Sequence, residues 1–376
     1  MDKAVFAAAR LSGRMAFFAA GFALSAWAPL VPYAKANLNA DEGTMGLLLL
    51  CMGFGGALTM PLAGWAVSRI GAKPLIIAGG LGMAMTLPLL GVLTSPVLFA
   101  AGLFLFGASL GLIDVSMNIH EVTIERATGI DKMSGLHAMF SVGSIAGSGA
   151  MAGVLALGIN PMAAALAGGA VTFFATLAAS PRLMAGRVEQ RPGMAWPRGI
   201  VILLALLAAL AFLAEGAVLD WSAILISGRG LLSQSTSGTG YFLFAIAMTA
   251  ARLGGDRIVR RFGAVRVLQM GSLIACAGFV ALLASPWVWL AMAGFALLGA
   301  GLGNTIPIMF GLAGRQKVMD SGIAVATITT IGYSGIMIGP GLIGLVAKET
   351  SLVTAFWLLA GLMLALATFA RMASRV

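Results

Sequence analysis

Residues 107–111 read GASLG, and residues 299–303, which lie 192 positions later, read GAGLG. The same shift of 192 positions aligns further glycines along the chain. The aligned pairs are Gly46/Gly238, Gly71/Gly263, Gly79/Gly271, Gly102/Gly294, Gly107/Gly299, Gly111/Gly303, Gly143/Gly335, Gly147/Gly339, Gly149/Gly341 and Gly169/Gly361. Self-similarity at one fixed shift indicates an internal repeat. The sequence therefore predicts two similar halves.

The composition indicates a membrane protein. Of the 376 residues, 60% are hydrophobic and 10% are charged, whereas a soluble domain carries about 25% charged residues. These figures exclude a soluble enzyme, a disordered chain and a nucleic-acid-binding domain. The net charge of +10 is typical of a polytopic membrane protein whose basic residues hold its loops on the cytoplasmic side, so no nucleic-acid partner is expected.

Twelve apolar segments are long enough to cross a membrane as helices, each needing about 20 residues. No alternating pattern typical of a membrane barrel is present. We expect an all-α membrane protein with twelve transmembrane helices in two parallel-repeated six-helix halves, at residues 1–184 and 199–376, with a cytoplasmic linker at 185–198. The segments lie near 14–36, 44–67, 73–93, 96–119, 133–157, 160–183, 199–226, 236–256, 264–285, 287–313, 318–346 and 350–371.

The basic residues predict the orientation. With both termini in the cytoplasm, only Lys35, Arg229 and Lys348 lie on the outer face. The other 20 of the 23 lysines and arginines (23 − 3) lie on the inner face, Arg252 among them. An excess of basic residues in inner loops is the rule for membrane proteins.

Two corresponding loops are similar to a family signature. Residues 64–74 read GWAVSRIGAKP, and residues 254–266 read GGDRIVRRFGAVR. Both resemble the G-x-x-x-D-R-x-G-R-K loop of the major facilitator superfamily, whose two halves alternate access to a site at the midplane. The resemblance implies either a gating role or a purely topological role for Gly64, Arg69, Gly71, Lys73, Asp256, Arg257, Arg261 and Gly263. Ser68 replaces the first acid of the signature, so the usual charge pairing of that loop is not expected.

The fourth span resembles one branch of this superfamily. Residues 109–121 read SLGLIDVSMNIHE, and the fucose–proton symporter branch has an acid followed four residues later by Asn, here Asp114 and Asn118. Residues 26–36, 135–148 and 214–225 are similar to uncharacterised YbjJ-like bacterial permeases. The resemblance implies a proton-coupled carrier in the bacterial inner membrane.

Two acids inside the spans are candidates for proton coupling. Asp114 lies within an apolar run, and Glu215 lies near the middle of the seventh span. An intramembrane acid usually faces a cavity or a proton path, and loss of water favours its neutral form. The alternative is a hydrogen bond to a neighbouring helix. By contrast, His120 is expected at the interface, and Glu121 is expected to be solvated near the cytoplasmic end.

A second set of polar and aromatic residues could line a solute site. Asn118 offers donors and an acceptor, or it serves as a clamp between helices. Asp220 either binds solute or lies at the outer end, paired with Arg229 or Lys35. The remaining candidates, for which packing or capping is the alternative role, are Trp27, His137, Asn304 and Tyr333.

The sequence thus predicts a proton-coupled secondary transporter of a small, sugar-like hydrophilic solute. Its expected partners are that solute, protons and the lipid bilayer, and a monomer is expected. The rival is a proton-driven exporter of amphipathic cations, drawn by Glu215 and Asp220. A sensor, scaffold or channel is less well supported. No nucleotide loop, metal-binding spacing or catalytic triad is visible, so no enzyme, cofactor or metal is expected.

Overall fold

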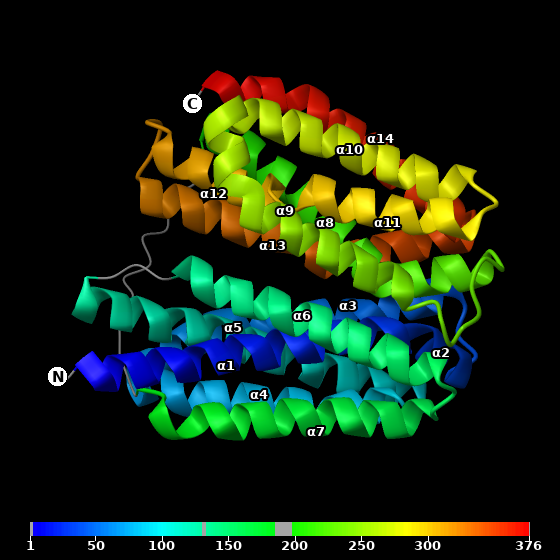
Figure 1. Cartoon of the computed structure of the whole chain (residues 1–376), viewed down its shortest axis with the longest axis horizontal. Coiled ribbons are helices and arrows are strands. Elements are labelled where there is room, and N and C mark those ends of the chain that lie inside the picture. Colours follow the sequence, from blue (N-terminus) through cyan, green and yellow to red (C-terminus); the bar gives the residue numbers. More distant parts are fainter. Residues whose placement is uncertain (1–2, 130–132, 185–197, 376) are drawn as a thin grey trace. The chain divides into compact units, whose positions relative to one another are not determined.

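A computed structural model describes residues 3–129, 133–184 and 198–375. Over these residues the chain is helical and contains no strand (Figure 1). The expected linker at 185–198 lies outside the described residues except for Arg198.

The first six spans follow one another with short connections. The first is interrupted by a 3₁₀ turn at Ala28–Leu30 (η1), next to Pro29 and Pro32, because proline removes a helical hydrogen bond. The helices are α1 (Lys3–Trp27), α2 (Val31–Asn37), α3 (Glu42–Ile70), α4 (Ala72–Leu90), α5 (Pro96–Thr128), α6 (Met133–Ala156) and α7 (Pro161–Ala179), followed by η2 (Ser180–Arg182).

The second six spans repeat this order, and the tenth span is broken into two helices. The break lies at Gly303 and Asn304. The helices are α8 (Ile200–Gly228), α9 (Thr239–Phe262), α10 (Ala264–Ala284), α11 (Val288–Leu302), α12 (Thr305–Arg315), α13 (Ser321–Glu349) and α14 (Leu352–Phe369), followed by η3 (Ala370–Arg375).

Eleven spans in the described residues are both long and apolar enough to cross a membrane. The remaining helix, α9, falls short in hydropathy because it carries Arg252, Asp256 and Arg257. Its 24 residues reach about 36 Å at 1.5 Å per residue, which is enough for a hydrocarbon core of about 30 Å. The fold expected from the sequence, twelve membrane helices in two repeated halves, is confirmed. One end was misplaced, since α5 continues to Thr128 rather than ending near residue 119.

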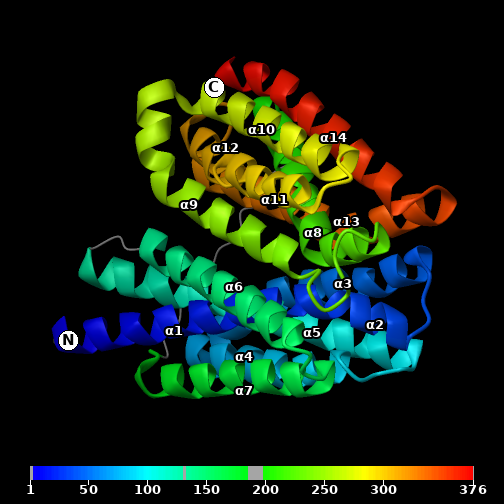
Figure 2. The ribbon, with the colours of Figure 1, turned by 45° about the vertical axis from the view of Figure 1, so that its right-hand side comes forward.

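The chain divides into two compact units with equivalent helix neighbours. One holds most of α1 to α7, and the other holds Asp41–Leu47 and most of α8 to α14. In the first, α1 packs against α6 and α4 against α5. In the second, α8 packs against α13 and α10 against α11 (Figure 2). These are the same pairs after the repeat is applied.

Some of the repeated glycines lie where two helix backbones meet. A Cβ atom on Gly107 would collide with the carbonyl oxygen of Met52, and one on Gly299 would collide with that of Phe244. Met52 and Phe244 are themselves 192 positions apart. The repeat therefore preserves contact pairs between helices, because only glycine permits so close an approach.

Two glycines shape the corresponding short turns. Gly71 precedes α4 with a φ of 85°, and Gly263 precedes α10 with a φ of 83°. Their N–H groups donate to the carbonyls of Val67 and Val259, at 2.9 and 2.8 Å. A side chain disfavours this φ, so both turns require glycine.

Replacing a contact glycine should destabilise the protein. Gly299→Ala places a Cβ atom against the carbonyl of Phe244, and we expect a cost of about 1–3 kcal/mol, typical of overpacking. Gly361→Ala is the matched control, because its Cβ would meet nothing within 4 Å. Thermal melting of the two purified variants would test this. Equal melting temperatures would contradict the importance of the glycine contacts.

Candidate functional site

In the first unit, α5 carries a paired acid and amide. The Nδ2 of Asn118 donates to the backbone oxygen of Asp114 at 2.8 Å and approaches its carboxylate Oδ1 at 3.4 Å. Both side chains are only partly buried. The expected relation between the two residues, one helical turn apart on one face, is present. Asp114 therefore has a nearby hydrogen-bond donor in Asn118, and part of its side chain remains exposed.

The cytoplasmic end of α5 differs from expectation. Glu121 is fully buried, and its Oε1 lies 3.3 Å from the Nε of Arg10 on α1. Arg10 also donates to the hydroxyl of Thr128 at 2.8 Å. The expectation of a solvated Glu121 was wrong because α5 extends past the end assigned from hydropathy. Its second oxygen, Oε2, has no hydrogen-bond partner among the described residues.

His120 also lies in the interior rather than at an interface. It is fully buried, and its Nε2 accepts the backbone N–H of Met184 at 3.1 Å. Its Nδ1 has no partner among the residues that the structure describes. This contact attaches the chain after η2 to α5, a structural role that the sequence pattern did not indicate.

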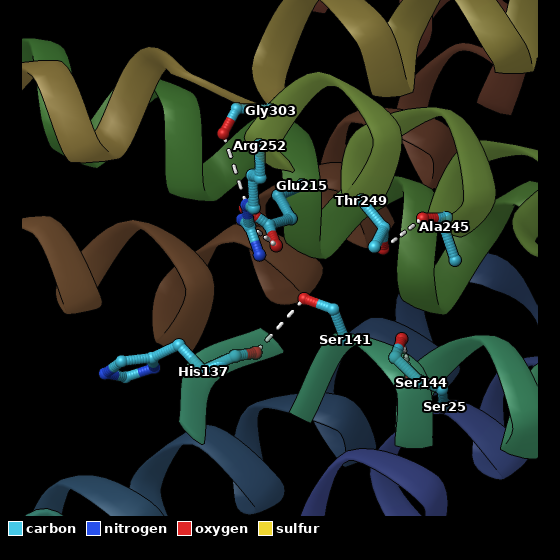
Figure 3. A network of polar contacts seen from close by, with 9 residues as sticks. All are labelled: Ser25, His137, Ser141, Ser144, Glu215, Ala245, Thr249, Arg252 and Gly303. Carbon is cyan, nitrogen blue, oxygen red and sulfur yellow. Dashed lines mark hydrogen bonds and ion pairs between the residues drawn. The ribbon is translucent and has the colours of Figure 1, made fainter. Parts of the chain in front are cut away.

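In the second unit, Glu215 of α8 pairs with Arg252 of α9. The Nη2 of Arg252 lies 3.6 Å from the Oε1 of Glu215, and its Nε donates to the carbonyl of Gly303 at 3.2 Å (Figure 3). The side chains of Arg252 and Glu215 are 33% and 24% exposed. Arg252 was expected at the cytoplasmic end of its span, and the sequence pattern did not indicate that its partner is Glu215.

Pro307 explains why Arg252 is needed at this point. In a continuous helix, the N–H of residue 307 would bond the carbonyl of Gly303 four residues earlier. Proline has no N–H, so that carbonyl is released and the span breaks there. Arg252 replaces the missing donor, since its Nε donates to Gly303. The broken helix and the charged pair therefore form one unit of structure.

Asn304 fixes the same break to α9 from the other side. Its Nδ2 donates to the carbonyl of Ala251 at 2.9 Å. Its Oδ1 lies where a Cβ atom on Gly255 would be. The amide of Asn304 thus fits against α9 only because residue 255 is glycine.

These polar groups are not copied by the repeat. A shift of 192 places an apolar residue opposite each one, so the two units share a backbone plan and differ in chemistry. The correspondences are Arg252 with Met60, Glu215 with Ala23, Asn304 with Leu112, Asp114 with Ile306 and Asn118 with Phe310.

The aromatic candidates make packing contacts. Trp27 is fully buried beside Phe99, with ring centroids 6.1 Å apart. Tyr333 is only partly buried and meets Phe212 edge to face at 5.1 Å. His137 is exposed, its ring lies 5.2 Å from that of Phe17, and its backbone carbonyl accepts the hydroxyl of Ser141 (Figure 3).

Asp220 lies buried in α8, next to two further buried polar groups. The Nε1 of Trp221 and the hydroxyl of Ser222 have no hydrogen-bond partner within the described ranges. Arg229, one suggested partner of Asp220, instead donates to carbonyls at the end of α10, including those of Leu283 at 3.0 Å and Ser285 at 2.8 Å. Burial lowers the pKa of the Arg229 guanidinium.

Most residues of the two expected loops lie at helix ends, since only Gly71 and Gly263 fall between helices. Arg69 stacks on Trp65 at 5.7 Å, and Lys73 donates to the carbonyl of Pro181 at 3.4 Å. Gly64 is partly buried. At the end of α9, Asp256 and Arg257 are exposed, and Arg261 lies over the ring of Phe262 at 5.3 Å.

Comparisons with known proteins identify relatives over nearly the whole chain. No protein-family model matches. The chain is 44% identical over 368 residues to an uncharacterized MFS-type transporter of Yersinia pestis, covering 97% of this chain and 96% of that protein. It is 29% identical over 347 residues to the uncharacterized transporter y4wD of Sinorhizobium fredii, covering 91% and 92%. It is 28% identical over 344 residues to the membrane protein MosC of Rhizobium meliloti, covering 89% and 83%.

Solved structures of transporters share the fold. A mutant form of the nucleoside transporter NupG matches with a TM-score of 0.79 at 15% identity, over 96% of this chain and 99% of that one. A D-xylose-proton symporter matches with a TM-score of 0.71 at 13% identity, over 96% of each chain.

Removing Arg10 should destabilise the first unit. Arg10→Met leaves Glu121 as a buried charge without its cation, which typically costs about 3–5 kcal/mol. The double variant Arg10→Met/Glu121→Met should recover much of that loss, because it removes both charges. Arg182→Met, at an exposed position in the same unit, is the control. Thermal melting would show this order, and an Arg10→Met variant as stable as the control would refute it.

Proposed function

This chain belongs to the MFS-type transporters, and from that premise we propose that it is a proton-coupled carrier of a small, sugar-like hydrophilic solute. It works by alternating access, as a monomer in the bacterial inner membrane, with both termini in the cytoplasm. The proposed halves are residues 1–184 and 199–376. Similarity in fold to a nucleoside transporter and a D-xylose-proton symporter supports a hydroxylated solute.

The observation that carries the proposal is the pair of Asp114 and Asn118 on α5. Asp114 lies 18 residues after Pro96 and 14 before Thr128, near the middle of an apolar helix. A charge at such a depth is costly. Loss of water therefore favours the protonated form of the carboxyl group, and a hydrogen bond from the amide of Asn118 favours the ionised form. These two alternatives are what a proton carrier needs.

Glu215 is proposed as a second acid in the coupling. It lies in α8, 15 residues after Ile200 and 13 before Gly228, and it has Arg252 beside it. An intramembrane acid that is paired and partly exposed is typical of a proton path. Asp114 and Glu215 lie in different units, and each unit then contributes one acid to the transport cycle.

The proposed solute contacts are polar and aromatic side chains within the spans. Asn118, His137 and Tyr333 are not fully buried, and a hydroxylated solute could hydrogen-bond to them. Buried Asp220 has two unpartnered polar neighbours on α8. Trp27 and Asn304 are proposed to support the site through packing and through the broken span. At the two turns, Gly71 and Gly263 are proposed to act in gating. The residues proposed to act with them are Gly64, Arg69, Lys73, Asp256, Arg257 and Arg261.

Export of amphipathic cations is the second candidate. Glu215 and Asp220 are the acids that would attract a cation. However, Arg252 lies 3.6 Å from Glu215, and its positive charge opposes a second cation there. This contact favours the neutral or acidic solute over the cationic one.

Asp114→Asn should abolish proton-driven accumulation. Asparagine keeps the shape of the side chain but cannot carry the proton, so labelled solute should not rise above its outside concentration in liposomes with an inward proton gradient. Counterflow without a gradient should persist, because it requires binding and movement but no net proton transfer.

Asp320→Asn serves as the matched control. Asp320 is an exposed acid whose oxygen caps α13 by accepting the N–H of Ile323, and Asn caps as well as Asp. Full accumulation is expected with this variant. If Asp114→Asn accumulates solute as Asp320→Asn does, Asp114 is not the coupling residue.

A further inference from the structure

We propose that Arg252 is the binding group for a carboxylate on the transported solute, and that Glu215 is the internal carboxylate that occupies this arginine when solute is absent. The proposal rests on the proposed function for the hydroxylated character of the solute and adds its charge. The solute class is then a hydroxylated monocarboxylate.

The donors of Arg252 are only partly used. A guanidinium has five N–H donors in a planar fork, and the Nε donates to Gly303. The contact to Glu215 is 3.6 Å, longer than the 2.7–2.9 Å typical of a charge-assisted hydrogen bond. Among the described residues no other partner of the fork is present, and one third of the side chain is exposed. The guanidinium is therefore held in place through its Nε, while its two Nη groups remain available for a ligand.

The open edge of this pair cannot face lipid at low cost. Arg252 lies 13 residues after Thr239 and 10 before Phe262 in α9, well inside the helix. Charged side chains inside membrane helices face a bundle interior or a water-filled cavity. The exposed edge of Arg252 and the exposed part of Glu215 thus belong to an aqueous space, where a solute can reach them.

The chemistry of the fork selects the ligand. Arginine binds carboxylate or phosphate through two parallel hydrogen bonds. Within the described residues, α11 and α12 add no charged side chain between Val288 and Gly314, and α13 adds none between Ser321 and Ala347. One guanidinium balances one carboxylate, whereas a phosphate monoester carries nearly two negative charges. A monocarboxylate is therefore the better match.

Glu215 makes the site competitive. The solute carboxylate and the carboxylate of Glu215 seek the same guanidinium, and two like charges near one cation repel each other. Glu215→Gln removes this competitor while keeping its shape, as a proton would. The assignment therefore predicts opposite effects at two neighbouring residues, since loss of Arg252 weakens binding and neutralisation of Glu215 strengthens it.

Binding of three matched sugars would test the assignment. D-glucuronate, D-glucose and D-glucosamine share one ring and differ in charge, and their binding to the full chain in lipid nanodiscs can be measured by calorimetry. We expect D-glucuronate to bind most tightly. Arg252→Gln should weaken its binding about tenfold or more, the scale of a lost hydrogen bond to a charged group. Glu215→Gln should tighten it severalfold, and Arg266→Gln, an exposed arginine on α10, should leave it unchanged.

Arg252→Gln also loses the contact to Gly303, so its melting temperature is measured in parallel. Arg252→Lys keeps the charge and loses the fork, and it should bind D-glucuronate more weakly than wild type. The assignment is overturned if D-glucuronate binds no tighter than D-glucose, or not at all. It is equally overturned if Glu215→Gln weakens binding. Binding is measured without a proton gradient, so its failure is distinct from a failure of proton coupling. A failure of proton coupling would appear only in the accumulation assay with Asp114→Asn.

Discussion

The hydrogen bond from Arg252 to the carbonyl of Gly303 is the contact on which the polar centre of the second unit depends. Pro307 cannot donate to that carbonyl, and a backbone acceptor left without a partner inside a membrane is costly. Arg252 meets this need and, in doing so, places a permanent positive charge within the bilayer. Glu215 balances the charge. The ion pair is therefore a consequence of the break in the span.

The two units show how one backbone plan can carry different chemistry. The close glycine contacts recur at equivalent positions, as with Gly107 against Met52 and Gly299 against Phe244. The polar groups do not recur, since Asp114 and Arg252 correspond to Ile306 and Met60. Helix packing is thus common to both units, while the first unit carries Asp114 with Asn118 and the second carries an ion pair beside a broken helix. This asymmetry is what a carrier that handles both a proton and a solute would require.

The fold could be predicted from sequence because apolar length, basic loops and repeated glycines each report on local structure. Glycine turns such as Gly71 were likewise visible as part of a loop pattern. The partners of charged residues were not, because they depend on contacts between distant segments. Arg252 was grouped with the other basic residues of the inner face, and nothing in that pattern indicated its contacts with Glu215 and Gly303.

The same limit applies to the end of α5. Hydropathy placed the end near residue 119, because His120 and Glu121 interrupt the apolar run. The helix continues because Arg10, 111 positions away, neutralises Glu121, and the backbone of Met184 binds His120. Nothing in the local pattern distinguishes a buried, paired acid from a solvated one.

Proton movement driven by solute tests the central claim most directly. The protein is placed in liposomes that contain a pH dye, with the membrane potential clamped and no proton gradient imposed. The sugar that binds most tightly among D-glucuronate, D-glucose and D-glucosamine is then added outside. The account predicts that the interior acidifies as labelled solute enters. Entry of the solute with no change in internal pH would contradict it.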